Sequence, residues 1–563
     1  MRAPSRTLPT SSAAALGLGL AVSLLGLASA GIDGAHAPAL TLEAPRDHAA
    51  SDGRYRVRVE PPEERARVEV SVDGAPRSDG PDHDGHLELA LAGPGLRRVA
   101  VVSRRRGDRQ SAIVDGVLVG PFATRDAARE RCGLSLQISA RALERIAVPA
   151  LRERLLAVAR QNPLLGEDAV VERLELRLLP GAARFEVALA GAHRIATAGV
   201  IDIRSRGERA LDLRLRSLGE VVFTGTLRDQ ARYGGAAVGA VITGPLAPLG
   251  AVAGYVIVDR YIDDRAREEL ETRLTAALAE VSGVALLPEA ASLAGDDPRA
   301  RVGLALCEPV VVDPSLGVIA TLRLAPAAAR DDLPLATPGP VDLGVALPPA
   351  APLAGEDVRV DLSLDAVNAL LDAWTRSGLL GELTHDHGLL DRARAGLGEW
   401  TTLELRELIP RLPPVVGLPD DDAPAGALSV GLGGVELAVD GVDPRFSAVV
   451  VGGQGHVWPE VDGGVIALRA RVDQLWLTCE RDDGRAGVTL DPCFGALLTH
   501  STVAEQLNVR LSEESGRLPS LDAAALLRER TAAVREGGLH LAELAVTRPN
   551  GAPGILRLSA RVE

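Results

Sequence analysis

The stretch VRVDLSLDAVNALLDAWTRSG, residues 358–378, contains the signals of a strand, a helix cap and an amphipathic helix in immediate succession. Its first residues alternate apolar and polar side chains, which is typical of a half-buried strand. Ser363 is a suitable N-cap, and Gly378 a suitable end. Between them, apolar residues recur at steps of three and four: Leu364, Val367, Leu370, Leu371 and Trp374. This unit predicts an α+β fold in which one helix face is buried.

The same order occurs earlier in the chain. Ser139 can cap a second helix, in which apolar residues again recur at helical spacing: Leu143, Ile146, Ala147, Leu151, Leu155 and Val158. Pro149 is expected to kink or divide this helix, because proline removes a backbone donor. Alternating strands follow each helix. In the first half they are expected at 174–178, 185–189, 200–203, 211–215 and 221–223.

Two halves of similar plan are therefore predicted, 121–325 and 357–563. The residues between them, 326–356, are rich in proline and alanine, which indicates a junction. The second half should end with a helix over 520–534 and a strand over 554–562. A long helix lying along a twisted sheet leaves a groove with aliphatic walls. That groove is the candidate site.

Residues 38–120 show a different pattern, with short alternating segments and turns. Strands are expected at 40–45, 55–59, 68–72, 86–91, 98–102 and 112–114, and Asp73-Gly74 is a tight-turn signal. This spacing predicts a small immunoglobulin-like β-sandwich, a kind of module that serves as a spacer or a recognition domain.

The first 30 residues have the features of a secretory signal peptide. Arg2 and Arg6 precede an apolar run, and the small residues Ala28, Ser29 and Ala30 follow it. The run is shorter than the roughly 20 residues of a membrane span, although a retained anchor is the alternative. We therefore expect a secreted or periplasmic protein, which could be associated with the cell surface.

Composition excludes one class of partner. The formal charge is −15 and aromatic residues make up 2% of the chain. Nucleic-acid binding requires clustered cations, and single strands also need aromatic platforms. Cores without aromatic rings are filled by leucine, valine, isoleucine and alanine, which leave smooth aliphatic walls. Such walls suit acyl chains, and they equally suit solid cores.

Four cysteines, Cys132, Cys307, Cys479 and Cys493, favour disulfides in an exported chain. Cys479 and Cys493 flank a turn-rich stretch and are the first expected pair. Cys132 with Cys307 follows by elimination.

Four segments resemble the family of bactericidal/permeability-increasing and lipopolysaccharide-binding proteins. Residues 360–380 are similar to the opening of that family's C-terminal barrel, and 408–414 to a proline-bearing stretch after it. Residues 554–562 resemble its last strand, and 138–143 the opening of its N-terminal barrel. The resemblance implies two helix-wrapped antiparallel β-barrels of tubular lipid-binding type, joined by a central sheet. It implies a phospholipid or other acyl-chain ligand. The family's cationic tip has no counterpart in this acidic chain.

The candidate groove residues lie on the apolar faces of the two helices: Leu143, Ile146, Leu151, Leu155, Leu364, Val367, Leu371 and Trp374. Ordinary core packing is the alternative for each of them. The uncharged stretch 234–258 suggests either peripheral membrane contact or a buried, kinked segment, since prolines interrupt it.

No catalytic residue, cofactor or resident metal is predicted. The chain lacks a Gly-x-Ser-x-Gly elbow, a His-Glu-x-x-His pair and a phosphate loop. The acidic and histidine-bearing segments 79–86, 385–387 and 420–422 could hold cations, but solvated turns explain them as well. Gly431, Gly433 and Gly434 indicate a turn between strands.

Three functions remain open. The first is a lipid carrier that is not an enzyme and that holds acyl chains in its grooves. The second is a surface adhesin or structural protein with solid cores, acting through protein contacts. The third is a hydrolase whose site no motif indicates.

Overall fold

The computed structural model describes the chain in parts. These are residues 39–44, 48–60, 67–104, 110–160, 168–191, 194–208, 210–224, 301–326, 335–379, 404–419, 426–440, 448–462, 465–480, 541–549 and 551–562, with short pieces at 267–292, 423–424, 488–489 and 520–522. The expected leader, the stretch 234–258, the segments 385–387 and 420–422, and most of the helix expected over 520–534 lie outside these residues.

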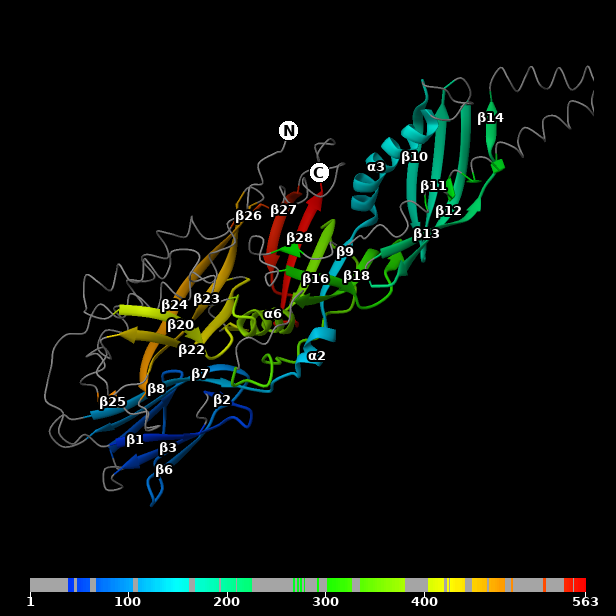
Figure 1. Cartoon of the computed structure of the whole chain (residues 1–563). Coiled ribbons are helices and arrows are strands. Elements are labelled where there is room, and N and C mark those ends of the chain that lie inside the picture. Colours follow the sequence, from blue (N-terminus) through cyan, green and yellow to red (C-terminus); the bar gives the residue numbers. More distant parts are fainter. Residues whose placement is uncertain are drawn as a thin grey trace, which may run out of the picture.

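A two-sheet β-sandwich forms the N-terminal part of the described chain (Figure 1). One sheet has the order β1-β3-β6, with β1 (Ala39–Ala44), β3 (Arg54–Glu60) and β6 (His86–Ala90). The other has the order β2-β8-β7-β4-β5. Its strands are β2 (Ala49–Ala50), β8 (Gln110–Val119), β7 (Gly95–Arg104), β4 (Val68–Val72) and β5 (Ala75–Arg77).

The sandwich folds as its alternation predicted. Inward-facing residues of both sheets, among them Tyr55, Val57, Val99 and Val101, form one buried core. Asp73 and Gly74 join β4 to β5 with φ of 51° and 80°, as a two-residue hairpin turn with two left-handed positions requires.

A central eight-stranded sheet connects the two halves, in the order β15-β16-β18-β9-β19-β28-β27, with β17 on β18. The strands from the first half are β9 (Cys132–Ile138), β15 (Ala291–Ser292), β16 (Arg301–Leu306), β17 (Val311–Asp313) and β18 (Gly317–Pro326). Those from the second half are β19 (Val358–Ser363), β27 (Leu541–Thr547) and β28 (Ile555–Val562). Strand β9 pairs with β18 on one side and β19 on the other, so it joins the halves. Short helix α2 (Arg125–Glu130) precedes it.

Cys132 and Cys307 form a disulfide with their Cα atoms 5.9 Å apart. It links β9 to the end of β16, across 175 residues of sequence. Cys479 lies in β24, and Cys493 lies outside the described residues, so their pairing stays a prediction.

Loss of the Cys132–Cys307 disulfide should destabilise the central sheet. A disulfide closing so long a loop restricts the unfolded chain, which stabilises a protein by about 2–4 kcal/mol. We expect the double variant Cys132→Ala, Cys307→Ala to unfold at lower urea concentration than the native protein, with a steeper transition because its unfolded chain is less compact. Equal midpoints under non-reducing conditions would show that the cross-link adds no stability.

A five-stranded antiparallel sheet continues from the central sheet at one end of the molecule (Figure 1). Its order is β10-β11-β12-β13, and β14 also pairs with β12. The strands are β10 (Val170–Leu179), β11 (Ala182–Ala190), β12 (Arg194–Arg206), β13 (Ala210–Leu218) and β14 (Val222–Thr224). Helix α3 (Ala140–Arg160) packs against β10.

A sheet with the order β20-β22-β23-β24-β26 lies in the second half, and β21 pairs with β22. Its strands are β20 (Glu404–Pro410), β21 (Val415–Gly417), β22 (Leu428–Asp440), β23 (Ala448–Asp462), β24 (Val465–Glu480) and β26 (Ser520–Asp522). The sandwich packs against this sheet, and β25 (Val488–Thr489) pairs with β8. The expected turn at Gly431–Gly434 is wrong, because these glycines lie within β22.

The glycines of β22 allow the sandwich to approach closely. A Cβ on Gly431 or Gly433 would lie 2.7 Å from Leu96 of the sandwich. Trp476 of β24, 2% exposed, fills the space between the two sheets beside Gly116 of β8. The sandwich is therefore fixed to the second half by a buried apolar contact.

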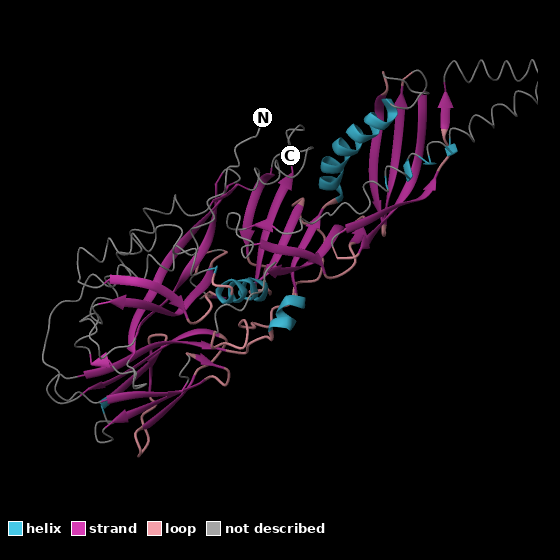
Figure 2. Ribbon diagram, viewed as in Figure 1, coloured by secondary structure: helices cyan, strands magenta, loops and turns pink. Residues whose placement is uncertain are grey.

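Figure 2 shows a molecule made mainly of strands, with few helices. The five sheets are open, and none closes into a barrel among the residues that the structure describes. The chain is thus mostly β with helices packed on sheets, and closure of the two expected barrels stays a prediction. Of the helices described, none has the length and apolar character needed to cross a membrane.

Candidate functional site

Helix α3 begins directly after β9, at the place that its sequence predicted. The Ser139 hydroxyl accepts a hydrogen bond from the N–H of Ala142 at 2.9 Å, and the Ser139 carbonyl accepts one from Leu143. The helix is continuous from Ala140 to Arg160, so the expected division at Pro149 does not occur. Arg152 of α3 donates to the carbonyl of Val171 in β10 at 2.7 Å.

The face of the β10–β14 sheet that packs against α3, termed the inner face, is almost entirely aliphatic. Strand register places alternate residues of each strand on it. Its members include Val171, Leu174, Leu176 and Leu178 of β10, Phe185, Val187 and Leu189 of β11, Ile195, Ile201 and Ile203 of β12, and Leu213 and Leu215 of β13. Among the described residues, the polar exceptions are Ser205, near the end of β12, and Thr197, whose hydroxyl donates to the carbonyl of Ala198.

The inner face is incompletely covered on its edge strand β10 and towards the Leu178 end of β12 and β13. Leu174, Leu176, Ile201, Ile203 and Leu215 are only partly buried, in contrast to the core of the N-terminal sandwich. From Leu178 to Val171 the surface spans six residue steps of the paired strand β11, because β10 contains one bulge residue, and it is about 20 Å long. The hydrocarbon of one bilayer leaflet is roughly 15 Å thick, so this surface is long enough for an acyl chain.

The opposite face of the same sheet carries charges. Arg173 pairs with Glu175 within β10, Arg184 pairs with Glu186 within β11, and Arg214 pairs with Asp212 in β13. The arginines of these pairs are largely exposed, so each pair adds little stability. The sheet therefore has a solvated face and an apolar face, and only the apolar one receives α3.

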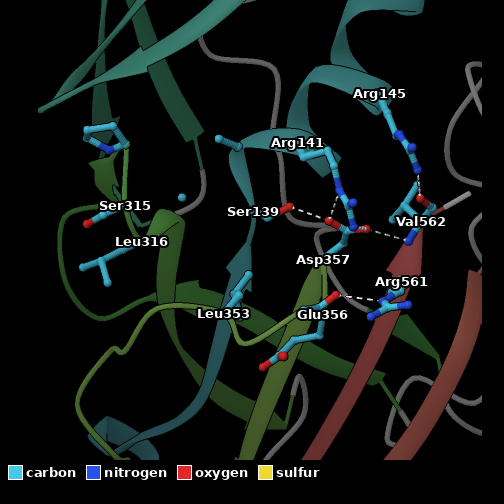
Figure 3. A pocket seen from close by; sticks show the side chains of 14 residues that line it. Ser139, Arg141, Arg145, Ser315, Leu316, Leu353, Glu356, Asp357, Arg561 and Val562 are labelled. Carbon is cyan, nitrogen blue, oxygen red and sulfur yellow. Dashed lines mark hydrogen bonds and ion pairs between the residues drawn. The ribbon is translucent and has the colours of Figure 1, made fainter.

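A cavity of about 580 Å³ lies where the first turn of α3 meets the central sheet (Figure 3). Its lining is polar and comes from four segments far apart in the sequence: Ser139–Arg141 with Arg145, Pro314–Gly317, Leu353 with Gly355–Asp357, and Arg561–Val562. We did not predict this cavity. Its arginines, serines and acids have no distinctive local pattern, and only the central sheet brings them together.

Asp357 organises one wall of the cavity. Its carboxylate accepts hydrogen bonds from Ser139 at 2.8 Å, from Arg141 at 2.7 and 3.0 Å, and from the N–H of Val562 at 3.1 Å. Burial alone would raise the pKa of Asp357, but these donors hold that pKa below its ordinary value. The cap of α3, the strand β28 and the start of β19 are thus tied to one ionised side chain.

Helix α6 (Leu364–Arg376) differs from its predicted orientation. Its buried positions include a row of polar residues, namely Asp365, Asn368, Asp372, Thr375 and Arg376, while Val367, Leu371 and Trp374 are partly buried. Each polar residue of this row is hydrogen-bonded. Asn368, for example, donates to the carbonyl of Val416 and accepts from its N–H. Arg376 bonds to Asp372 and to Thr337.

The candidate groove residues differ in burial between the two helices. Leu143 and Leu155 of α3 are partly buried and pack on the inner face. Leu364 of α6 is fully buried. The α3 positions of Ile146 and Leu151 are described, but their side chains are not.

The described part of the chain contains no group of three histidine, cysteine, aspartate or glutamate side chains placed to hold a metal ion. In the loop 79–86, Asp82 instead accepts hydrogen bonds from the N–H groups of Asp84 and His86, as a turn residue does.

Comparison with known proteins gives only distant structural likenesses. No family model matches the chain, and no curated protein matches it. A solved structure of lipopolysaccharide binding protein aligns with 77% of this chain and 99% of its own, at 14% sequence identity and a TM-score of 0.29. A TM-score of this size does not establish a common fold.

Proposed function

We propose that this protein is an exported lipid-binding protein that holds acyl chains without transforming them. One observation carries the proposal. The inner face beneath α3 is a continuous aliphatic surface, about 20 Å long, on which Leu174, Leu176, Ile201, Ile203 and Leu215 are only partly buried. Burial of a methylene group contributes about 0.8 kcal/mol, so ten of them could contribute about 8 kcal/mol before the costs of ordering the chain.

Several further features support export and carriage. The leader signals in residues 1–30 and the Cys132–Cys307 disulfide are typical of proteins that leave the cytoplasm. The N-terminal sandwich pairs a β1-β3-β6 sheet with a second sheet containing β4, β7 and β8, which supports an immunoglobulin-like module. We infer that this module positions the second half, since it packs against β22–β24. A phospholipid or a fatty acid is the proposed cargo.

A charged substitution on the inner face should weaken lipid binding strongly. A charge introduced at Leu176 would lie among aliphatic side chains, where an acyl chain cannot compensate its lost hydration. We expect Leu176→Glu to weaken uptake of a fluorescent fatty acid at least tenfold. Arg177→Glu is the matched control, because its side chain is 74% exposed and belongs to the opposite face.

Circular dichroism would establish that both variants keep their strands. Equal uptake by Leu176→Glu and the native protein would contradict the proposal. Absence of uptake by the native protein would favour the second candidate, an adhesin with solid cores.

A further inference from the structure

The polar cavity and the inner face meet at the first turn of α3. Ala140 lines the cavity and also packs in the apolar cluster of Leu178, Ala183 and Val312. The β17–β18 hairpin contributes to both places as well. Its turn, Pro314–Gly317, lines the cavity, while Val312 and Val318 in its strands belong to the cluster. The polar cavity is therefore continuous with the end of the inner face at which Leu178 lies.

The cavity carries more positive than negative charge. Arg141, Arg145 and Arg561 line it together with Glu356 and Asp357. Glu356 pairs with Arg359, and Asp357 pairs with Arg141. The amino end of the 21-residue helix α3 adds a partial positive charge at the same place.

Arg145 is the least neutralised cation of the three. It donates to the backbone carbonyl of Val562, and none of the described carboxylates lies within ion-pair distance of its guanidinium. Arg561 donates to the carbonyl of Gly355 and to Glu543, and Figure 3 shows Arg145 and Arg561 on either side of Val562. A guanidinium has five N–H donors, so both retain donors for a ligand.

We propose that this cavity binds the anionic head group of an amphiphile, a carboxylate or a phosphate monoester, whose tail lies along the inner face. The inference rests on the proposed function and deepens it, since it names the class of cargo. Ser139 and Ser315 also line the cavity, but their hydroxyl groups donate to Asp357 and Asp313, so the arginines are the donors for the head group. Head and tail would then be recognised by two compartments that share Ala140.

Equilibrium binding of three radiolabelled probes tests this. Native protein should bind palmitate at least tenfold more tightly than 1-hexadecanol, which has a tail of the same length and no charge. Inorganic phosphate, which has no tail, should bind at least a hundredfold more weakly than palmitate. Arg145→Gln should weaken palmitate binding about tenfold and change hexadecanol binding less than twofold. Glutamine is chosen because its amide can still donate to the Val562 carbonyl.

Arg177→Gln, on the exposed face of β10, is the control and should bind both lipids as the native protein does. Equal affinities of the native protein for palmitate and hexadecanol would overturn the inference and leave the proposed function standing. The inference would also be overturned if phosphate bound as tightly as palmitate. The same holds if Arg145→Gln lost affinity for palmitate and for hexadecanol by the same factor. Failure to bind either lipid would overturn both proposals. The probe comparison on native protein requires no variant, so it decides the matter even if Arg145→Gln does not fold.

Discussion

Replacement of Trp476 by alanine is expected to destabilise the protein by about 3–5 kcal/mol. Its side chain is 2% exposed and belongs to the buried cluster that joins the sandwich to the second half, with Leu96, Val114 and Leu412. Removal of the indole leaves a cavity that neither sheet can close, because the backbones of β8 and β23 are held by their own hydrogen bonds. Urea unfolding followed by circular dichroism measures the loss.

Two comparisons make this prediction specific. Gly116→Ala should destabilise the same contact, since its new Cβ would lie 2.6 Å from the Trp476 ring. Leu418→Ala, at a position 48% exposed, should change the free energy of unfolding by less than about 0.5 kcal/mol. A Trp476→Ala protein as stable as Leu418→Ala would show that the sandwich is only loosely attached.

Replacement of Arg131 by methionine should destabilise the junction between the halves by about 3 kcal/mol. Arg131 donates to Asp342 and to Asp365 at 2.7–2.8 Å, and Asp365 is buried. Without the guanidinium, two carboxylates would face each other in a partly buried place. This loss of unfolding free energy is at the lower end of the range for buried ion pairs, because Arg131 itself is 30% exposed.

The carboxylates of Asp342 and Asp365 predict how the stability of the protein depends on pH. The Arg131 hydrogen bond lowers the pKa of Asp342 to about 2, so the stability that Asp342 contributes is present above its ordinary pKa and is lost as pH falls towards 2. Burial raises the pKa of Asp365, although the N–H groups of Leu343 and Val345 oppose this. In Arg131→Met a proton on Asp365 relieves the repulsion.

The stability difference between Arg131→Met and the native protein should therefore shrink when pH falls from 7 to about 4. Unfolding titrations at the two pH values measure it, with Arg177→Met as a control that shows no difference at either. A deficit that is constant with pH would contradict this account of the carboxylate pair.

Local periodicity explains what the sequence could predict. Strands β3, β4, β6 and β10–β13 lie where alternation placed them, because the side-chain period of a strand is a property of consecutive residues. Helices α3 and α6 begin at Ser139 and Ser363 for the same reason, since a cap acts on the next few N–H groups.

The features that the sequence could not predict depend on partners that are distant in the chain. The polar residues of α6 are buried because Thr337 and Val416 supply their hydrogen bonds, and no local pattern shows this. Gly431 and Gly433 have the composition of a turn, but their function is to admit Leu96 of the sandwich. The cavity unites Ser139, Asp357 and Arg561, which lie hundreds of residues apart.

Photoaffinity labelling with a diazirine-bearing palmitate tests the central claim most directly. Peptide mass spectrometry of the labelled native protein should place the adducts within residues 140–160 and 170–218, where α3 and the inner face lie. An excess of unlabelled palmitate should suppress them. Adducts confined to the sandwich at 39–119, or insensitive to the competitor, would contradict the account.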